Sequence, residues 1–332
     1  MKKTERIFEF NSIFAPFLHD YFLLKKAMGN KGVSLGTNLR LFDRYCIEKG
    51  LTELILDSEL VDEWLNSFGE TKPHTRATKI TQLKDFAKYF SQKGYEVNWI
   101  PKPGYARDGK KYMPYIFSEK EVVQLFDVAN SLPPNYGNTR FHLLFPVILR
   151  VLYCTGARIS EVLRLRISDV DLENGFLYFN DGKFDKSRRI PISDTLLTTL
   201  KRYYSSNIDY IGIDEDNFFF PNASGEQYSQ RTVYDKFREV LWKAGIPHQG
   251  KGKGPRVHDL RHTFAVHSLH KILISGRDAY AALTTLMAYL GHSRIGSTEY
   301  YLRLTSEIYP EILEMTADYS NRIIPKGVQI YE

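Results

Sequence analysis

The sequence predicts a mainly α-helical protein with one small antiparallel β-sheet, an α+β arrangement divided into two domains. Its 332 residues are 43% hydrophobic, which suffices for two ordinary cores. Apolar residues recur at helical spacing in most segments, and only a short region near residues 175–192 reads as paired strands. A stretch rich in proline, glycine and charge predicts a linker at 105–114, between a helical domain at 1–104 and a second domain at 115–332.

Bulk properties narrow the class of protein. The net charge of +6 leans mildly toward nucleic acid or anionic surfaces. Cys46 and Cys154 lie among apolar residues and match no ligand spacing, which favours free thiols in a reducing compartment. The segment MKKTERIFEF is not a signal peptide, and no apolar run approaches the roughly 20 residues that span a bilayer. We therefore expect a cytoplasmic protein without a membrane partner.

Four helices are expected in the first domain, each with apolar residues at helical spacing. Their ranges are about Asn11–Ala27, Leu35–Lys49, Ser58–Phe68 and Thr75–Lys93. Charge is unevenly spread, because residues 52–70 hold six acids and no Lys or Arg, whereas residues 71–93 hold six basic residues against Asp85. Basic residues of the second and fourth helices predict a DNA-facing surface, and the alternative is an ordinary solvated face. The candidates are Arg40, Arg44, Arg76, Lys79 and Lys84.

The linker carries basic residues, and the second domain opens with a helix-capping pair. Lys110 and Lys111 are candidates for contact with a DNA backbone that crosses between the domains, with simple solubility as the alternative. Ser118 and Glu121 form a capping box that opens a helix.

A buried helix should place an arginine at a turn. The apolar segment 141–153 predicts a core helix that ends at Gly156, a residue suited to a helix C-cap. Arg158 then starts a short helix, where its charge adds to the positive field of the helix N-terminus and suits a phosphate. Glu161, three residues on, is placed to support Arg158. The alternative is a surface arginine with an ordinary partner.

A basic hairpin follows. Segments 175–179 and 189–192 predict two strands, and the turn between them carries Lys183, Lys186 and Arg188. A lysine on such a hairpin can reach a site on another surface and give a proton to a leaving oxygen, although a solvated turn is the commoner use. Helices are expected at about 193–206 and 231–244, with a strand at 217–220 between them.

The segment 249–301 carries the densest set of reactive residues. Lys251 and Lys253 lie in a glycine-rich loop that either follows phosphates or is a plain connector. Beyond it, His258 and Arg261 share a helical face, and Tyr301 follows His292 by nine residues. Phosphate chemistry needs such parts: a fork-shaped cation, imidazoles that move protons and a hydroxyl that attacks. The zinc motif H-E-x-x-H fails at 259, which is aspartate, so no metal site is expected.

Four motifs in this order resemble the tyrosine recombinases of the phage integrase family. TGARISE at 155–161 resembles their first box, HDLRHTFA at 258–265 the second, and LGHS at 290–293 with Tyr301 the third. GKFDKSRRIP at 182–191 is similar to the hairpin that carries the family's catalytic lysine. The match covers roughly residues 120–305 and implies a catalytic domain there. The first domain resembles the family's four-helix core-binding domain in size, helicity and charge.

The resemblance implies a role for each reactive residue. Arg158 and Arg261 would clamp the scissile phosphate, so that neither metal nor another cofactor is needed. Tyr301 would attack phosphorus and form a 3′-phosphotyrosine bond. Of two adjacent tyrosines, the spacing from His292 favours Tyr301 over Tyr300. By the same resemblance, Lys183 would be the general acid for the leaving group. His258 would act as general base and acid, and His292 would hydrogen-bond the phosphate.

The same resemblance implies partners. These are duplex DNA with inverted-repeat core sites and a homotetramer on that DNA, in which the C-terminal tail passes to a neighbouring subunit or folds back on its own domain. Accessory or companion recombinases are also implied, as is a mobile-element role. The alternatives are a type IB topoisomerase-like enzyme with the same chemistry, and a DNA-binding protein that keeps the fold without cleaving.

Overall fold

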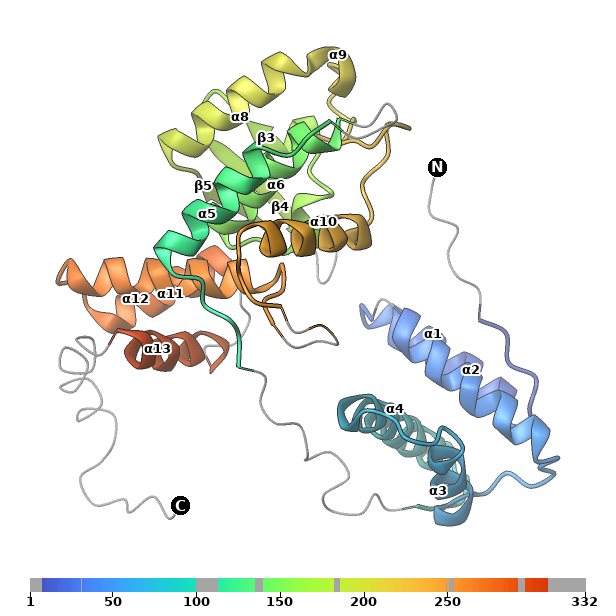
Figure 1. Cartoon of the computed structure of the whole chain (residues 1–332). Coiled ribbons are helices and arrows are strands. Elements are labelled where there is room, and N and C mark those ends of the chain that lie inside the picture. The colour runs from blue at the N-terminus through green and yellow to red at the C-terminus, as the bar shows by residue number, and fades with distance from the viewer. Residues whose placement is uncertain are drawn as a thin grey trace, which may run out of the picture. The chain divides into compact units, whose positions relative to one another are not determined.

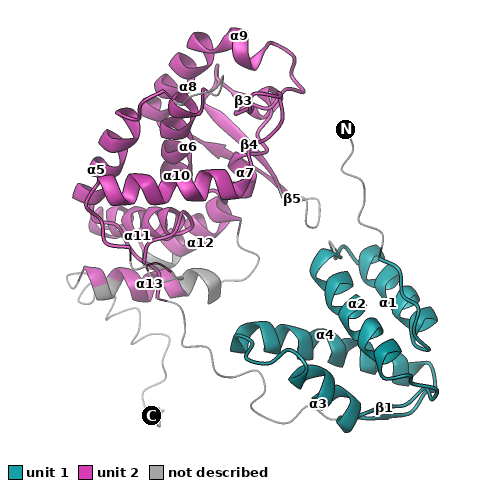
Figure 2. Ribbon diagram, turned by 45° about the vertical axis from the view of Figure 1, so that its right-hand side comes forward, with its two compact units in different colours: residues 1–112 teal, residues 113–332 magenta. Residues whose placement is uncertain are grey.

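A computed structural model describes residues 8–30, 32–99, 113–134, 140–181, 186–248, 250, 254–291 and 296–309. The chain divides into two compact units, residues 1–112 and 113–332 (Figure 2). The expected linker at 105–114 lies outside the described residues except for Met113 and Pro114. No helix within the described ranges is both long and apolar enough to cross a membrane.

Unit 1 contains four helices in its described part, each within a few residues of its expected range (Figure 1). They are α1 (Ala15–Ala27), α2 (Val33–Glu48), α3 (Ser58–Asn66) and α4 (Pro73–Gln92). Two short strands, β1 (Leu56–Asp57) and β2 (Val97–Asn98), pair in parallel. Two residues are too few to show a strand periodicity, so this pair could not be predicted from the sequence.

Aromatic side chains fill the core of unit 1. Phe14 packs against Phe90 with ring centroids 5.4 Å apart, and Phe42 packs against Trp64 at the same separation. Asp43 of α2 is also buried, and its carboxylate accepts hydrogen bonds from the backbone N–H groups of residues 11 and 12. This pairing satisfies the buried charge and holds the segment before α1 against α2.

Unit 2 is mainly helical and carries one small sheet (Figure 1). Its helices are α5 (Glu119–Asn130), α6 (Phe141–Thr155), α7 (Ile159–Val162), α8 (Asp194–Ser206), α9 (Ile208–Ile211), α10 (Gln230–Lys243), α11 (Asp259–Ile274), α12 (Ala279–Leu290) and α13 (Gly296–Ile308), with a 3₁₀ turn η1 (Ile167–Asp169). Figure 1 shows α11, α12 and α13 together at one end of the unit, and α8 and α9 at the other. The capping box that starts α5 is confirmed: Ser118 accepts from the Glu121 N–H, and the Glu121 carboxylate accepts from the Ser118 N–H.

The sheet has the antiparallel order β3–β4–β5, formed by Val170–Asp171, Phe176–Asp181 and Lys186–Pro191. In its register, Phe179 of β4 lies opposite Arg188 of β5. The β4–β5 hairpin was expected from the sequence.

The strand expected at 217–220 is wrong. Only one isolated bridge, between Arg166 and Phe218, occurs there. Phe219 and Phe220 are buried in an irregular segment, where the Tyr203 hydroxyl of α8 donates to the Phe219 carbonyl. The apolar run therefore reflects burial in the core, and its backbone pairing is limited to the short contact with residues 165–167.

Helix α6 runs through the core of unit 2 and ends where α11 and α12 approach it. Ten of its side chains are buried, and Gly156 caps its end with φ 59°. A Cβ at position 156 would lie 2.5 Å from Phe264 Cδ1 of α11 and 2.8 Å from Leu290 Cδ2 of α12. Glycine thus allows three helices to meet closely at this turn.

Candidate active site

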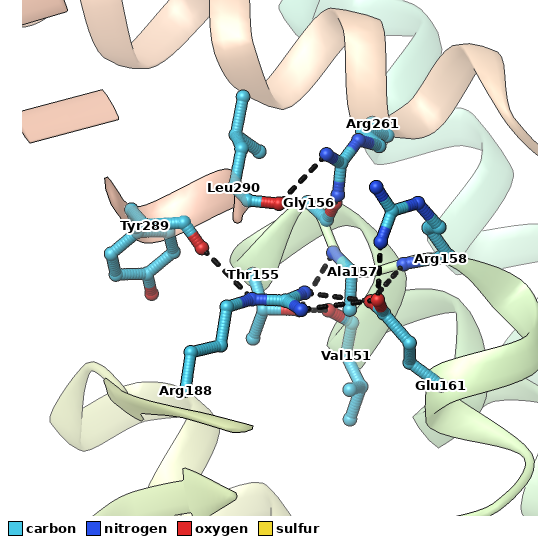
Figure 3. A network of polar contacts seen from close by, with 10 residues as sticks. All are labelled: Val151, Thr155, Gly156, Ala157, Arg158, Glu161, Arg188, Arg261, Tyr289 and Leu290. Atoms are coloured by element: carbon cyan, nitrogen blue, oxygen red, sulfur yellow. Dashed lines mark hydrogen bonds and ion pairs between the residues drawn. The ribbon is translucent and has the colours of Figure 1, made fainter. Parts of the chain in front are cut away.

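Arg261 lies at the meeting point of these three helices (Figure 3). It is 2% exposed; its Nη1 donates to the Gly156 carbonyl at 2.7 Å, and its Nη2 donates to the Leu290 carbonyl at 2.8 Å. Burial, and next among the lowering effects the charge of Arg158, lower the pKa of Arg261 to about 10. The guanidinium is therefore still a cation at neutral pH, and its position is fixed by two backbone groups.

Tyr301 of α13 is buried beside Arg261. Burial raises the pKa of the Tyr301 hydroxyl, while the charge of Arg261 and its hydrogen bond to the phenol act in the opposite direction. The Tyr301 ring also packs against His262, with centroids 5.6 Å apart. Tyr300 is only half-buried, and the Arg303 guanidinium lies 5.3 Å from its ring centroid. Of the two adjacent tyrosines, Tyr301 is the one whose side chain hydrogen-bonds Arg261.

His258 precedes α11 and stands at its N-cap. Its ring packs perpendicular to that of His262, with centroids 5.0 Å apart. The pKa of His258 is lowered to about 4, first because neighbouring groups displace water from the ring and then because Arg261, Arg158 and Arg256 are cations. The imidazole is therefore neutral at pH 7 and able to accept a proton. A phosphate anion among these cations would raise the pKa of His258 again.

Arg158 is the N-cap residue of α7, as predicted from the sequence. Its backbone N–H donates to Glu161 Oε2 at 2.8 Å, and its Nη1 contacts Glu161 Oε1 at 2.7 Å. The Arg158 side chain is 36% exposed, whereas that of Glu161 is 5% exposed. The contact between Glu161 and Arg158 that we expected is therefore present, and the arginine side chain remains partly exposed.

Glu161 has a second partner, Arg188 of β5 (Figure 3). Arg188 Nη1 contacts Glu161 Oε1 at 3.0 Å and Nη2 contacts Oε2 at 2.6 Å, a bidentate pair. The Arg188 Nε donates to the Tyr289 carbonyl at 3.2 Å. We expected Arg188 to contact DNA, but its side chain points inward and is 12% exposed. The sequence did not show this, because 27 residues separate Arg188 from the carboxylate.

Several expected site residues lie outside the described part of the chain. They are Lys183, His292, Lys110, Lys111, Lys251 and Lys253. The backbone of Lys186 pairs with Asp181 at the end of the hairpin. Elsewhere in the described residues, no group of three His, Cys, Asp or Glu side chains is placed to hold a metal ion.

The basic residues expected on unit 1 have different surroundings. Arg40, Arg44 and Lys84 are exposed, and Arg44 pairs with Glu48 at 2.9 Å. Arg76 donates from Nη1 to the Leu65 carbonyl at 3.1 Å.

Lys79 departs from the expected DNA-facing position. It is 6% exposed, and its ammonium lies over the ring of Phe68, in a cation–π contact. Burial, followed by the charge of Arg76, lowers the pKa of Lys79 to about 8. Lys79 therefore packs against α3 and the residues after it, and does not form part of an exposed basic surface.

Glu161 makes the stability of the site depend on pH. Its two arginine partners overcome the effect of burial and lower its pKa to about 2, against an ordinary value of 4.5. A carboxylate with a lowered folded-state pKa stabilises the fold above about pH 4.5, and this contribution is lost as the pH falls toward 2. We expect Glu161→Gln to lower the free energy of unfolding by a few kcal/mol at pH 7 and by much less at pH 3. Urea unfolding of both proteins at the two pH values measures this, and an equal difference at both would contradict it.

The model of the phage integrase family matches residues 116–307. The chain is 30% identical over 293 residues to the putative integrase/recombinase y4rE of Sinorhizobium fredii, which covers 87% of this chain and 92% of that protein. It is 33% identical over 209 residues to the tyrosine recombinase XerA of Pyrococcus furiosus, covering 61% and 62% of the two chains.

Solved structures share the fold. The XerH site-specific recombinase bound to a palindromic difH substrate, in a post-cleavage complex, aligns with a TM-score of 0.63 and 18% identity, covering 87% of this chain and 80% of that one. The integrase of the Tn1549 transposon, in complex with a circular intermediate DNA, aligns with a TM-score of 0.60 and 15% identity, covering 86% and 94%.

Proposed function

The chain belongs to the phage integrase family, and we propose that Arg158, Arg261 and Tyr301 carry its reaction at a single DNA phosphate. It is a tyrosine-type site-specific recombinase, an enzyme that breaks and rejoins DNA strands. The observation that best supports these residue roles is the contact of the buried Tyr301 hydroxyl with Arg261, a cation already held by the carbonyls of Gly156 and Leu290.

The two arginines account for the stabilisation of charge. A phosphodiester under attack gathers negative charge on its non-bridging oxygens, and planar guanidinium groups pair with such oxygens in a bidentate manner. Arg261 is fixed by its backbone partners, and Arg158 is supported by Glu161 while its side chain remains partly exposed. Both cations therefore keep their positions before DNA arrives, which lowers the cost of reorganisation during the reaction.

Proton and bond changes balance across the step. The Tyr301 oxygen forms a bond to phosphorus and loses its proton to the neutral imidazole of His258. The bond from phosphorus to the 5′ oxygen breaks, and that oxygen takes a proton from Lys183, while His292 hydrogen-bonds the phosphate. The product is a 3′-phosphotyrosine, and attack by a 5′ hydroxyl reverses the step without ATP, because the ester keeps the free energy of the broken bond.

The partners follow from this chemistry and from the relatives. We propose that the chain acts in the cytoplasm on duplex DNA with inverted-repeat core sites, as a homotetramer whose C-terminal tails pass between subunits, with accessory or companion recombinases where the element requires them. The exposed Arg40, Arg44 and Lys84 of unit 1 are the side chains that we assign to the DNA backbone. Similarity to a transposon integrase supports a mobile-element role.

Covalent trapping tests the proposal. Nicked duplexes from the DNA that flanks the gene are incubated with the protein in EDTA and without ATP, because a nick lets the short product diffuse away and prevents rejoining. We expect a denaturant-stable adduct that protease treatment reduces to a tyrosyl 3′-phosphate. The matched control is a duplex of equal length and scrambled sequence.

Two outcomes would oppose the proposal. Tight binding to the flanking duplexes without any adduct would indicate a DNA-binding protein that does not cleave. Adducts of equal yield on scrambled DNA, together with relaxation of any supercoiled plasmid, would indicate a topoisomerase-like enzyme.

A further inference from the structure

The carboxylate of Glu161 joins two arginines from distant parts of the chain (Figure 3). Its Oε1 accepts from Arg158 Nη1 at 2.7 Å and from Arg188 Nη1 at 3.0 Å. Its Oε2 accepts from the Arg158 backbone N–H at 2.8 Å and from Arg188 Nη2 at 2.6 Å. Each carboxylate oxygen thus takes one bond from each arginine. Because the Glu161 side chain is 5% exposed, the position of this buried charge depends on both cations.

The third nitrogen of the Arg188 guanidinium binds the end of α12. This Nε donates to the Tyr289 carbonyl at 3.2 Å, and the next carbonyl, that of Leu290, accepts from Arg261 Nη2 at 2.8 Å. The last carbonyls of a helix have no partner within the helix and attract cations. A Cβ at Gly291 would lie 3.1 Å from Arg188 Cδ, so the arginine passes close to this backbone. Two arginines therefore bind successive carbonyls at one helix end.

These contacts run without a break from Arg158 to the helix end that binds Arg261. Glu161 connects Arg158 to Arg188, whose Nε in turn reaches the end of α12. We propose that Arg188 is a positioning residue that fixes the separation of Arg158 and Arg261, the two arginines of the phosphate clamp. The inference rests on the proposed function, in which both guanidinium groups bind one DNA phosphate.

The separation of the two clamp arginines matters because the negative charge of the transition state gathers on oxygens at fixed distances from each other. Cations that already stand at hydrogen-bond distance from these oxygens stabilise the charge without reorganisation. Arg158 caps the four-residue helix α7, and so short a helix depends on tertiary contacts for its position. We therefore expect loss of Arg188 to let Arg158 shift relative to Arg261. A displacement of about 1 Å at a reacting centre costs on the order of 10²-fold in rate.

The neighbouring arginine offers a matched control one residue away. Arg189 points to the other face of β5, is exposed, and its guanidinium lies 3.5 Å from the ring centroid of Phe176. Arg188 points inward and is 12% exposed. Arg189→Ala thus removes the same charge from the same strand and leaves the contacts of Glu161 in place.

A substrate with a neutral phosphorus group tests the role of Arg188 directly. In a methylphosphonate link, a methyl group replaces one non-bridging oxygen, and the group carries no net charge. The bonds that change are the same, because Tyr301 still attacks phosphorus and the 5′ oxygen still leaves. Less negative charge gathers in the transition state, so the exact separation of the two cations should matter less for this substrate.

The experiment measures the rate of adduct formation by the full-length protein on nicked duplexes with an ordinary phosphate or a methylphosphonate at the cleavage position. We expect Arg188→Ala to slow cleavage of the phosphate by about 10²-fold and cleavage of the methylphosphonate by less than about 5-fold. Arg158→Ala should show the same preference with a larger loss on the phosphate. Arg189→Ala should cleave both substrates at close to the wild-type rate.

A double-mutant cycle on the ordinary phosphate gives a second, independent test. A connection that is broken at Glu161 gains little from an intact Arg188, so Glu161→Gln with Arg188→Ala should cleave no more than about 3-fold slower than the slower single variant. The amide also leaves no buried, unpaired charge, and thermal unfolding reports whether each variant folds. If Arg188→Ala fails to fold, Arg188→Lys replaces it, with a smaller loss that is again largest on the phosphate.

The outcomes separate this inference from the proposed function. Equal losses of Arg188→Ala on the two substrates, no loss on the phosphate, or additive losses in the cycle would overturn the inference. Where no variant cleaves the methylphosphonate, the cycle decides. By contrast, an Arg158→Ala variant that cleaves the phosphate at the wild-type rate, or a wild-type protein that forms no adduct, would show that the proposed function itself is wrong.

Discussion

Tyr301→Phe is expected to form no covalent adduct with DNA, whereas Tyr300→Phe should form it at nearly the wild-type rate. Removing the hydroxyl of Tyr301 removes the group that we propose as the nucleophile, the one that hydrogen-bonds Arg261. Phenylalanine retains the ring that packs against His262, so we expect the fold and DNA binding to persist. Denaturing electrophoresis of labelled nicked duplexes, with a binding assay on the same samples, measures both properties.

The adjacent tyrosine is a stringent control. Consecutive residues point about 100° apart on a helix, so only one of the two can face the phosphate. Tyr300 lies with its ring beneath Arg303. An adduct that is lost in Tyr300→Phe and kept in Tyr301→Phe would show that the nucleophile has been assigned one residue too late.

Arg261→Ala should cause the second large loss, in both cleavage and stability. Loss of one phosphate-binding arginine lowers the rate by about 10³-fold or more. The substitution also leaves the buried carbonyls of Gly156 and Leu290 without their donor, at about 1–3 kcal/mol for each. Single-turnover cleavage and urea unfolding measure the two effects.

Arg261→Lys distinguishes the effect of the positive charge at this position from the effect of the planar arrangement of the guanidinium N–H groups. Lysine keeps the positive charge but cannot present two parallel N–H groups, so cleavage should remain strongly impaired while part of the stability returns. Arg277→Ala, an exposed arginine beyond the end of α11, is the surface control and should match the wild type in both assays. A cleavage rate for Arg261→Ala within about 10-fold of the wild type would contradict the role that we assign to this residue.

Features that depend on residues close together in the sequence could be predicted. Helix spacing, capping residues and contacts within one helical turn are visible in the sequence itself. Helical spacing gave α1 to α4 to within a few residues, and Ser118 with Glu121 gave the start of α5. The three-residue spacing of Arg158 and Glu161 likewise gave their contact.

The parts that were missed depend on tertiary packing. Arg188 and Lys79 were read as surface cations, since nothing near them in the sequence reveals a buried carboxylate or an aromatic ring. The apolar segment at 217–220 was read as a strand, because a short buried run has the same pattern whether or not it pairs.

Arg261 holds two backbone carbonyls and is also assigned to the DNA phosphate, so loss of cleavage in a descendant would remove only one of its two roles. A descendant that no longer cut DNA would have no use for the Tyr301 hydroxyl and could replace it freely. It would still keep Arg261, because the turn at Gly156 and the end of α12 are held by this guanidinium whether or not DNA is cut. On the roles proposed above, we expect relatives of this chain to keep the buried arginine in general, and to keep the tyrosine only where they still cut DNA.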